Sequence, residues 1–251
     1  MIVAIIQARM GSTRLPRKSL KEILGKPLLL HIIERLRFSK SIDKIAIATS
    51  DGSADDEIAD FADKNGIAVY RGSETDLLDR FYQAAKKFGA EHIVRVWGDS
   101  VLIDPKVVDA VIDHYLKEHF DYCSNVHPPT FVRGNDVEVF SFKALETAWK
   151  EVSDPVFREY MTDYIYRNPS IFKIGNVKND TDLSGFNAVE IDYEEDFILA
   201  KSILEHFNGR MFYMNDILEF LKQNPDVADI NKNKLRYADY KEQLKKKGLS
   251  L

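Results

Sequence analysis

The chain of 251 residues contains a single cysteine, Cys123. An intramolecular disulfide is therefore impossible, and a zinc site built from several cysteines is excluded. This cysteine usage fits a reducing, cytoplasmic location. The sequence also lacks an excess of positive charge, because 35 Lys and Arg residues face 40 Asp and Glu residues for a formal net charge of -5. Proteins that bind long nucleic acids neutralise many phosphates, so this balance argues against that class.

Long hydrophobic runs are missing as well. The apolar stretch Ile2–Ile6 has no basic segment before it and is followed at once by Gln7 and Arg9. It is too short for a membrane span and has the wrong flanks for a signal peptide, so we expect no membrane partner. With 45% hydrophobic and 30% charged residues, the chain can bury a sizeable core.

Short apolar segments alternate with amphipathic helical patterns through the first half of the chain. Val3–Ile6 is typical of a strand that is buried on both faces of a parallel sheet. Further strands are predicted at Ile42–Thr49, Ile67–Tyr70 and His92–Trp97, and helices after Pro27 and at Ser53–Asn65, Asp76–Phe88 and Pro105–Glu118. This alternation predicts an α/β fold with a mostly parallel sheet flanked by helices.

The pattern changes after Asp121. Strands are predicted at Tyr122–Asn125, Val137–Phe140 and Ile171–Asn176, and helices at Ser141–Glu151 and Pro155–Arg167. We interpret residues 127–186 as an inserted α+β lobe that forms an acceptor pocket or a dimer surface. The chain then returns to a strand at Ala188–Ile191 and to helices at Glu194–Phe207 and Asn215–Lys222, with an exposed helix end at Tyr237–Lys247. No linker interrupts it, so residues 1–251 are predicted to form a single domain.

The segment Gln7–Lys18, with the sequence QARMGSTRLPRK, directly follows the first predicted strand. Gly11 lets the backbone approach a ligand, Ser12 offers a hydroxyl, and four cations follow one another within ten residues: Arg9, Arg14, Arg17 and Lys18. Loops at the carboxyl edge of an α/β sheet often bind phosphates. The segment matches neither the Walker A pattern nor the three-glycine dinucleotide pattern. It therefore predicts a polyphosphate site of another kind.

Two aspartates also follow predicted strands directly. Asp99 comes after His92–Trp97 and Gly98, and Asp192 comes after Ala188–Ile191. Mg²⁺ commonly takes one or two protein carboxylates together with phosphate oxygens and water, which makes the two aspartates a candidate metal pair. Either could instead cap the helix that follows it.

Other polar residues give weaker signals. The six histidines are scattered and are expected to be ordinary surface or core residues, and Cys123 is expected to be a small buried residue. The acidic run Asp55, Asp56, Glu57 and Asp60 is typical of an exposed helix start.

The run QARMGSTRLPRKSL, together with GKPLL at Gly25–Leu29, resembles the cytidylyltransferase family that includes the CMP-KDO and CMP-acylneuraminate synthetases. Within it, the chain is most similar to the branch named spore coat polysaccharide biosynthesis proteins. The match continues through ATSD, RGSETDLLDRF, WGDSVLIDP and GNDVEVFS and ends near EIDYEEDF, so it covers most of the chain. The resemblance implies a Rossmann-like nucleotide-diphospho-sugar transferase fold and a homodimer formed through the lobe.

The resemblance also implies roles for individual residues. Arg9 and Lys18 would hold the triphosphate of CTP and act in catalysis with Asp99, while Arg14 assists. Ala8, Gly11 and Ser12 would provide nucleotide contacts in the loop, and Asp99 and Asp192 would hold Mg²⁺. Arg71 and Ser73 would help to select cytosine. The neighbouring Asp79 and Arg80 either belong to the same set near the base and ribose or form an internal ion pair that shapes the pocket, and the ion pair is the favoured interpretation.

The acceptor side departs from the family pattern. Sugar-acid enzymes of the family carry a histidine followed four residues later by a tyrosine, whereas this chain has Tyr160 and Tyr164 at those places. Trp97, Ser100 and Val101 also differ from the usual residues around the Gly-Asp pair. The candidate acceptor residues are Asn125, Arg133, Asp136 and Tyr164, although each could equally be part of ordinary loop or strand structure.

The resulting hypothesis is a Mg²⁺-dependent transfer of CMP from CTP to a sugar acid or related small acceptor. Pyrophosphate would be released, in the synthesis of cell-surface polysaccharides or glycan precursors. The alternatives are a nucleotidylyltransferase for sugar 1-phosphates or phosphonates, a glycosyltransferase, and a catalytically silent nucleotide-binding protein. The glycosyltransferase lacks support because no Asp-x-Asp motif follows a predicted strand convincingly.

Overall fold

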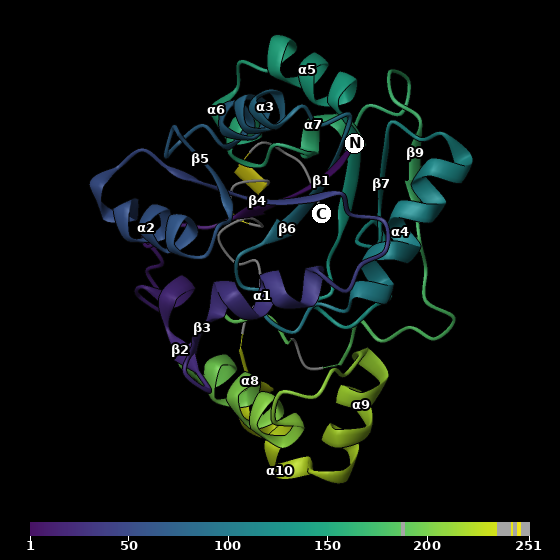
Figure 1. Cartoon of the computed structure of the whole chain (residues 1–251). Coiled ribbons are helices and arrows are strands. Elements are labelled where there is room, and N and C mark those ends of the chain that lie inside the picture. Colours follow the sequence, from purple (N-terminus) through teal and green to yellow (C-terminus); the bar gives the residue numbers. More distant parts are fainter. Residues whose placement is uncertain (187–188, 235–241, 243–244, 247–251) are drawn as a thin grey trace.

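A computed structural model describes residues 1–186, 189–234, 242 and 245–246 (Figure 1). Its centre is a seven-stranded sheet that lies between two groups of helices, with the strand order β5-β4-β1-β6-β8-β7-β9. The strands are β1 (Ile2–Gln7), β4 (Lys44–Ser50), β5 (Ala68–Gly72), β6 (His92–Trp97), β7 (Tyr122–Ser124), β8 (Glu138–Ser141) and β9 (Ile174–Asn176). A separate hairpin pairs β2 (Glu22–Ile23) with β3 (Lys26–Pro27).

The first half of the chain builds the parallel part of the sheet. Strand β1 pairs in parallel with β4 on one side and with β6 on the other, and β4 pairs in parallel with β5. Successive strands therefore leave β1 first in one direction and then in the other. Such a reversal of strand order leaves a crevice at the carboxyl ends of the two central strands, here β1 and β6.

Residues 127–186 extend the same sheet. Strand β8 is antiparallel to both β6 and β7, and β9 lies parallel to β7. The segment thus supplies two strands of the central sheet as well as the helices α5 to α7. The organisation as a single domain with an inserted lobe remains a prediction. The role of the lobe in acceptor binding or dimerisation also remains a prediction, because its packing on the sheet does not reveal a function.

The helices cover both faces of the sheet. They are α1 (Leu28–Leu36), α2 (Asp56–Lys64), α3 (Leu77–Phe88), α4 (Pro105–Glu118), α5 (Phe142–Glu151), α6 (Pro155–Glu159), α7 (Asp163–Tyr166), α8 (Glu194–Phe207), α9 (Met214–Gln223) and α10 (Pro225–Ala228). Side chains alternate along a strand. In β1, Ala4 and Ile6 therefore pack with α1, α4, α8 and α9, whereas Val3 and Ile5 pack with α3, α5 and α7. In Figure 1, helices α8 to α10 lie together beyond α1.

The predicted fold class is confirmed, and the predicted strands and helices of the first half are all present. The predicted strand at Ala188–Ile191 is wrong for the described residues 189–191, and Ala188 lies outside them. The reason is that the N–H groups of Val189 and Ile191 donate to Arg133 and Asp99, which belong to loops and offer no continuous strand edge.

Two further predictions need correction. The predicted helix Pro155–Arg167 is divided into α6 and α7, because Tyr160 leaves the helical conformation at φ -95° and ψ 64°. The predicted strand Ile171–Asn176 shortens to β9. Most of the expected helix end at Tyr237–Lys247 lies outside the described residues. No helix among the described residues is long and apolar enough to cross a membrane.

Candidate active site

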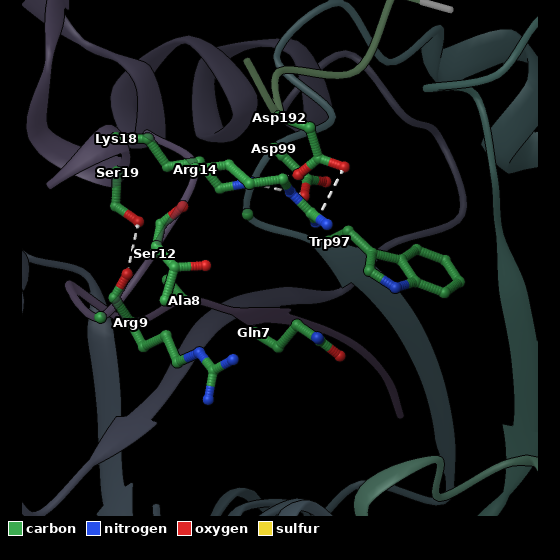
Figure 2. Close-up of a pocket in the computed structure, with 13 residues that line it drawn as sticks. Gln7, Ala8, Arg9, Ser12, Arg14, Lys18, Ser19, Trp97, Asp99 and Asp192 are labelled. Carbon is green, nitrogen blue, oxygen red and sulfur yellow. Dashed lines mark hydrogen bonds and ion pairs between the residues drawn. The ribbon is translucent and has the colours of Figure 1, made fainter. Parts of the chain in front are cut away.

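A pocket lies at the crevice between the carboxyl ends of β1 and β6, with a cavity volume of about 250 Å³. The residues that line it are Gln7, Ala8, Arg9, Gly11, Ser12, Thr13, Arg14, Lys18, Ser19, Trp97, Gly98, Asp99 and Asp192. Most of the residues that the sequence assigned to nucleotide, metal and catalysis thus line one cavity (Figure 2).

The loop after β1 is anchored at several points. Met10 and Leu15 are buried, with 6% and 4% of their surface exposed, and they fix the loop to the core. The Met10 N–H donates to Asp55 Oδ1 at 2.6 Å, and Ser19 Oγ donates to the Arg9 carbonyl at 3.2 Å. The loop backbone is therefore fixed in position, and so are the polar groups that it carries. The prediction that Asp55 is exposed is wrong, since it is 2% exposed and also accepts from the Ser50 N–H at the end of β4.

A glycine brings the two strand ends close together. The Gly98 N–H donates to the Gln7 carbonyl at 2.9 Å, and a Cβ at position 98 would lie 2.6 Å from that oxygen. Any other residue would force β1 and β6 apart at this point. Gly98 thereby holds Asp99 beside the loop that follows β1.

Lys18 joins the loop to both aspartates. Its Nζ donates to Asp99 Oδ2 and Asp192 Oδ1, each at 2.9 Å, and to the Ile191 carbonyl at 2.8 Å. Burial lowers the pKa of Lys18, but attraction to Asp99 and Asp192 outweighs burial and the net shift is upward. The ammonium is therefore held in its charged form at the centre of the pocket.

Neither aspartate acts as a helix cap. The N-terminus of α4 is capped by Asp104, which accepts from the Lys106 N–H. Before α8, Asp196 accepts from the N–H groups of Asp192 and Tyr193, and this holds Asp192 in place. The Ile191 N–H in turn donates to the Asp99 carbonyl at 3.0 Å, so the two aspartates lie side by side without a strand ladder.

The two carboxylates fit the donor set that Mg²⁺ prefers when it is also bound to a nucleotide. Asp99 Oδ1 accepts no hydrogen bond from the described residues, whereas both Asp192 oxygens are engaged, one by Lys18 and one by Arg14 at 3.2 Å. In the described part of the chain, no group of three or more His, Cys, Asp or Glu side chains could hold a metal ion. A metal here would thus need oxygen atoms from phosphate and water.

The loop arginines point in different directions. Arg14 lies over the Tyr193 ring at 5.5 Å, close to Asp192. The Arg9 guanidinium forms no ion pair within the described ranges, and Figure 2 shows it on the opposite side of the pocket from the aspartates. Arg17 turns away from the pocket and pairs with Glu57 on α2. Arg9 therefore offers an uncompensated positive charge to a ligand, and Arg17 does not.

Arg71 and Ser73, assigned to cytosine selection, are not among the residues that line the pocket. Arg71 donates to the Ser50 and Gly52 carbonyls, at 3.1 and 3.0 Å, and Ser73 Oγ accepts from the Asp76 N–H. Their contacts shape the end of β5, and a role in base selection remains a prediction.

The expected ion pair between Asp79 and Arg80 is absent from the contacts of the described residues. Asp79 accepts from Trp149 Nε1 at 2.8 Å, and Arg80 donates to the Ser73 carbonyl at 2.8 Å. The two residues are adjacent on α3, so their side chains leave the helix in different directions. Asp79 instead holds the Trp149 indole, and Arg80 holds the backbone at Ser73.

The four acceptor candidates do not lie together. Asn125 is buried and uses its amide on the backbone of Asn135 and Val137. Tyr164 donates to Glu151 at the end of α5 and packs edge-on against Phe172. These two side chains serve local structure, and acceptor contacts by them remain predictions.

Arg133 and Asp136 do not line the pocket, but both lie near Glu190. Arg133 Nε is 3.9 Å from Glu190 Oε1. Burial, followed by the negative charges of Asp136 and Asp99, raises the pKa of Glu190 to about 8. A carboxyl group that the sequence did not single out thus lies next to the two aspartates, where burial and crowding of like charges favour its protonated form.

A buried polar network under the pocket was also missed. Arg95 NH1 donates to Glu138 Oε2 at 2.8 Å and to Thr162 Oγ1 at 3.1 Å, and Arg95 Nε donates to Gln7 Oε1 at 2.9 Å. Arg95 and Glu138 are each a charged residue inside an otherwise apolar strand. That pattern was a usable signal, because buried charges need partners.

Sequence comparison decides the family. The family model described as "Cytidylyltransferase" matches residues 3–234. The chain belongs to the cytidylyltransferase family. This confirms the family resemblance found in the sequence.

The chain is also similar to several individual proteins, over most or part of its length. The cytidylyltransferase is 38% identical over 242 residues to the uncharacterized protein MJ1063 of Methanocaldococcus jannaschii, covering 96% of this chain and 98% of the relative. It is 30% identical over 236 residues to the spore coat polysaccharide biosynthesis protein SpsF of Bacillus subtilis, covering 90% and 96%. A 3-deoxy-manno-octulosonate cytidylyltransferase of Anaeromyxobacter dehalogenans is 39% identical over 114 residues, which cover 44% and 46% of the two chains.

Solved structures share the fold. A cytidylyltransferase from Leptospira borgpetersenii superposes with a TM-score of 0.86 at 35% identity and covers 94% of this chain and 98% of its own. The CMP:2-keto-3-deoxy-manno-octonic acid synthetase complexed with CTP superposes with a TM-score of 0.60 at 17% identity, covering 82% and 98%. The second likeness concerns the fold alone.

Proposed function

We propose that this cytidylyltransferase moves CMP from CTP to a sugar acid or a related small acceptor and releases pyrophosphate. The observation that carries the proposal is Lys18, whose ammonium lies between Asp99 and Asp192 beside a cationic loop at the crevice. The names of SpsF and of the 3-deoxy-manno-octulosonate cytidylyltransferases support a role in making cell-surface polysaccharide or glycan precursors.

In this proposal the side chains act by position and charge. Arg9, whose guanidinium has no ion pair among the described residues, and Lys18 bind the phosphates. Arg14 assists them, and Ala8, Gly11 and Ser12 line the phosphate path. The in-line attack of an acceptor oxygen on the α-phosphate increases charge on the phosphate oxygens, and fixed cations in a partly buried site stabilise that charge. No covalent intermediate is needed.

We assign Asp99 and Asp192 as the residues that would hold Mg²⁺. When bound, the ion would neutralise phosphate charge and polarise the reacting oxygens. Asp99 contributes Oδ1, which accepts no hydrogen bond from the residues that the structure describes, and Asp196 keeps Asp192 oriented through two backbone N–H groups. The proposal includes a homodimer and a cytoplasmic location.

The test is a nucleotide and acceptor panel. Pyrophosphate release is measured with CTP, UTP, ATP or GTP and Mg²⁺ over sugar acids, sugar 1-phosphates and phosphonates, and again after addition of EDTA. We expect release with CTP and a sugar acid, and its loss with EDTA. Release with a sugar 1-phosphate or a phosphonate alone would replace the proposed acceptor class. Tight CTP binding without release on any acceptor would overturn the proposal in favour of a silent nucleotide-binding protein.

A further inference from the structure

Gln7 and Trp97 form one wall of the pocket, and neither residue is assigned to phosphate binding. They are direct register partners at the carboxyl ends of β1 and β6, and both line the cavity. Figure 2 shows Trp97 on the far side of the Asp99–Asp192 pair from Ser12 and Arg9. A molecule between this wall and the aspartates would lie next to a nucleotide bound along the loop.

The orientation of the Gln7 amide follows from its neighbour. Arg95 Nε donates to Gln7 Oε1 at 2.9 Å. A guanidinium can only donate hydrogen bonds, so the amide oxygen must face Arg95 and the NH₂ group must face the other way. Gln7 is half-buried and lines the cavity, and this orientation gives the pocket a hydrogen-bond donor at that point.

Arg95 is itself fixed from below. Its side chain is 8% exposed and pairs with Glu138, which is 3% exposed. The other Glu138 oxygen accepts from Tyr122 Oη at 2.5 Å and from Thr162 Oγ1 at 2.9 Å. A buried network whose members are all paired rigidifies the residues that it contacts. Gln7 therefore has one preferred amide orientation.

The same guanidinium supports Trp97. The Arg95 carbon Cζ lies 4.4 Å from the centre of the Trp97 ring, a cation–π contact that holds the indole against the network. Trp97 is half-buried and lines the cavity. An aromatic surface beside a hydrogen-bond donor suits a sugar ring, which has apolar C–H faces and oxygen acceptors on its edge.

We propose that Gln7 and Trp97 determine acceptor specificity: the Trp97 ring covers one face of the acceptor sugar, and Gln7 Nε2 donates to a carboxylate oxygen on it. The inference rests on the proposed function and names two residues that would bind its acceptor. A carboxylate is the favoured partner because a hydrogen bond to a charged acceptor is stronger than one to a neutral hydroxyl. Arg95, Glu138 and Thr162 are positioning residues.

An isosteric change tests Gln7. In Gln7→Glu, one carboxylate oxygen still accepts from Arg95, but the atom that faces the pocket becomes an acceptor and carries charge. We expect the KM for a sugar acid to rise about tenfold to a hundredfold, since a hydrogen bond to a charged group is lost. The KM for CTP should rise by a smaller factor, because the new negative charge lines the same pocket as the phosphate-binding residues. Gln223→Glu, on the exposed end of α9, makes the same charge change away from the pocket and is the matched control.

Tryptophan fluorescence gives a readout that does not depend on turnover. The chain has two tryptophans, Trp97 and Trp149, and the latter stacks on Tyr82 at the α3–α5 contact. In Trp149→Phe, Trp97 is the only tryptophan. We expect 3-deoxy-manno-octulosonate or an acylneuraminate, added with CTP in EDTA, to change its emission beyond the change given by CTP alone. With Gln7→Glu also present, the titration should shift to higher sugar concentration.

The outcomes separate the two proposals. If wild-type protein releases pyrophosphate with a sugar acid and Gln7→Glu behaves like Gln223→Glu, the specificity inference is wrong and the proposed function stands. If no sugar acid is turned over but the Trp97 emission responds to one, the wall binds the ligand and the proposed reaction fails. If neither turnover nor emission responds to any sugar acid, both are overturned.

Discussion

Replacing Lys18 by Met removes a cation that joins the loop to both aspartates. The change deletes three hydrogen bonds, two of them to carboxylates, and leaves the negative charges of Asp99 and Asp192 next to each other. The side chains of these two aspartates are 23% and 19% exposed, so water can replace part of the lost interaction. We expect the free energy of unfolding to fall by about 2–3 kcal/mol, and not by the full sum of the bonds.

The effect on turnover should be larger than the effect on stability. Removing one preorganised charge-stabilising group typically lowers kcat by roughly 10²–10³. Lys21→Met is the matched control: Lys21 forms a single, more exposed pair with Glu194, and its loss should change stability by less than about 1 kcal/mol. Urea denaturation measures the first quantity, and pyrophosphate release under saturating CTP measures the second.

The two variants together make the reasoning refutable. Turnover of Lys18→Met close to that of the wild type would show that the ammonium is not part of the catalytic machinery. An equal loss of turnover in Lys21→Met would show that general loss of positive charge, and not the position between the aspartates, is responsible.

Two further predictions concern stability. Arg95→Met leaves the buried Glu138 carboxylate without its cation and should lower the free energy of unfolding, measured in urea, by about 3–5 kcal/mol. Adding Glu138→Gln should restore part of that loss, and equal free energies for the single and double variants would contradict a paired charge. Burial lowers the pKa of His31, whose Nε2 lies 2.9 Å from the Ile23 carbonyl. The unfolded chain thus binds this proton more readily, and the stability that His31 contributes above its unfolded pKa of about 6.5 is lost as pH falls below that value. His31→Gln should reduce the difference in unfolding free energy between about pH 7.5 and pH 5.5, and an unchanged difference would contradict the assignment.

Local sequence patterns predicted much of the sheet and the loop. The run Val3–Ile6 identified β1 because a strand buried on both faces must be apolar throughout. The position of the loop after that strand followed from chain order. Within Tyr160–Tyr164, the residue that reaches the network under the pocket is Thr162, which the sequence did not single out.

Sequence patterns gave wrong predictions where a residue bonds to a backbone group that is distant in the sequence. Asp55 looked like part of an exposed acidic run, yet it holds the loop backbone at Met10. The segment 189–191 looked like a strand, yet its N–H groups bond to two loops. In both cases the local sequence is compatible with the prediction, and only a contact with a distant backbone group decides otherwise.

The sequence by itself determined the parallel α/β core, the cationic loop after β1 and the types of residue available for nucleotide chemistry. These features follow from periodicity and chain order, which are local properties. The tertiary structure decided that Lys18 meets Asp99 and Asp192, which are 81 and 174 residues away, and that Arg95 orients Gln7 across 88 residues. Such contacts depend on how strands order themselves in the sheet and on where buried charges find partners, and no local pattern specifies either.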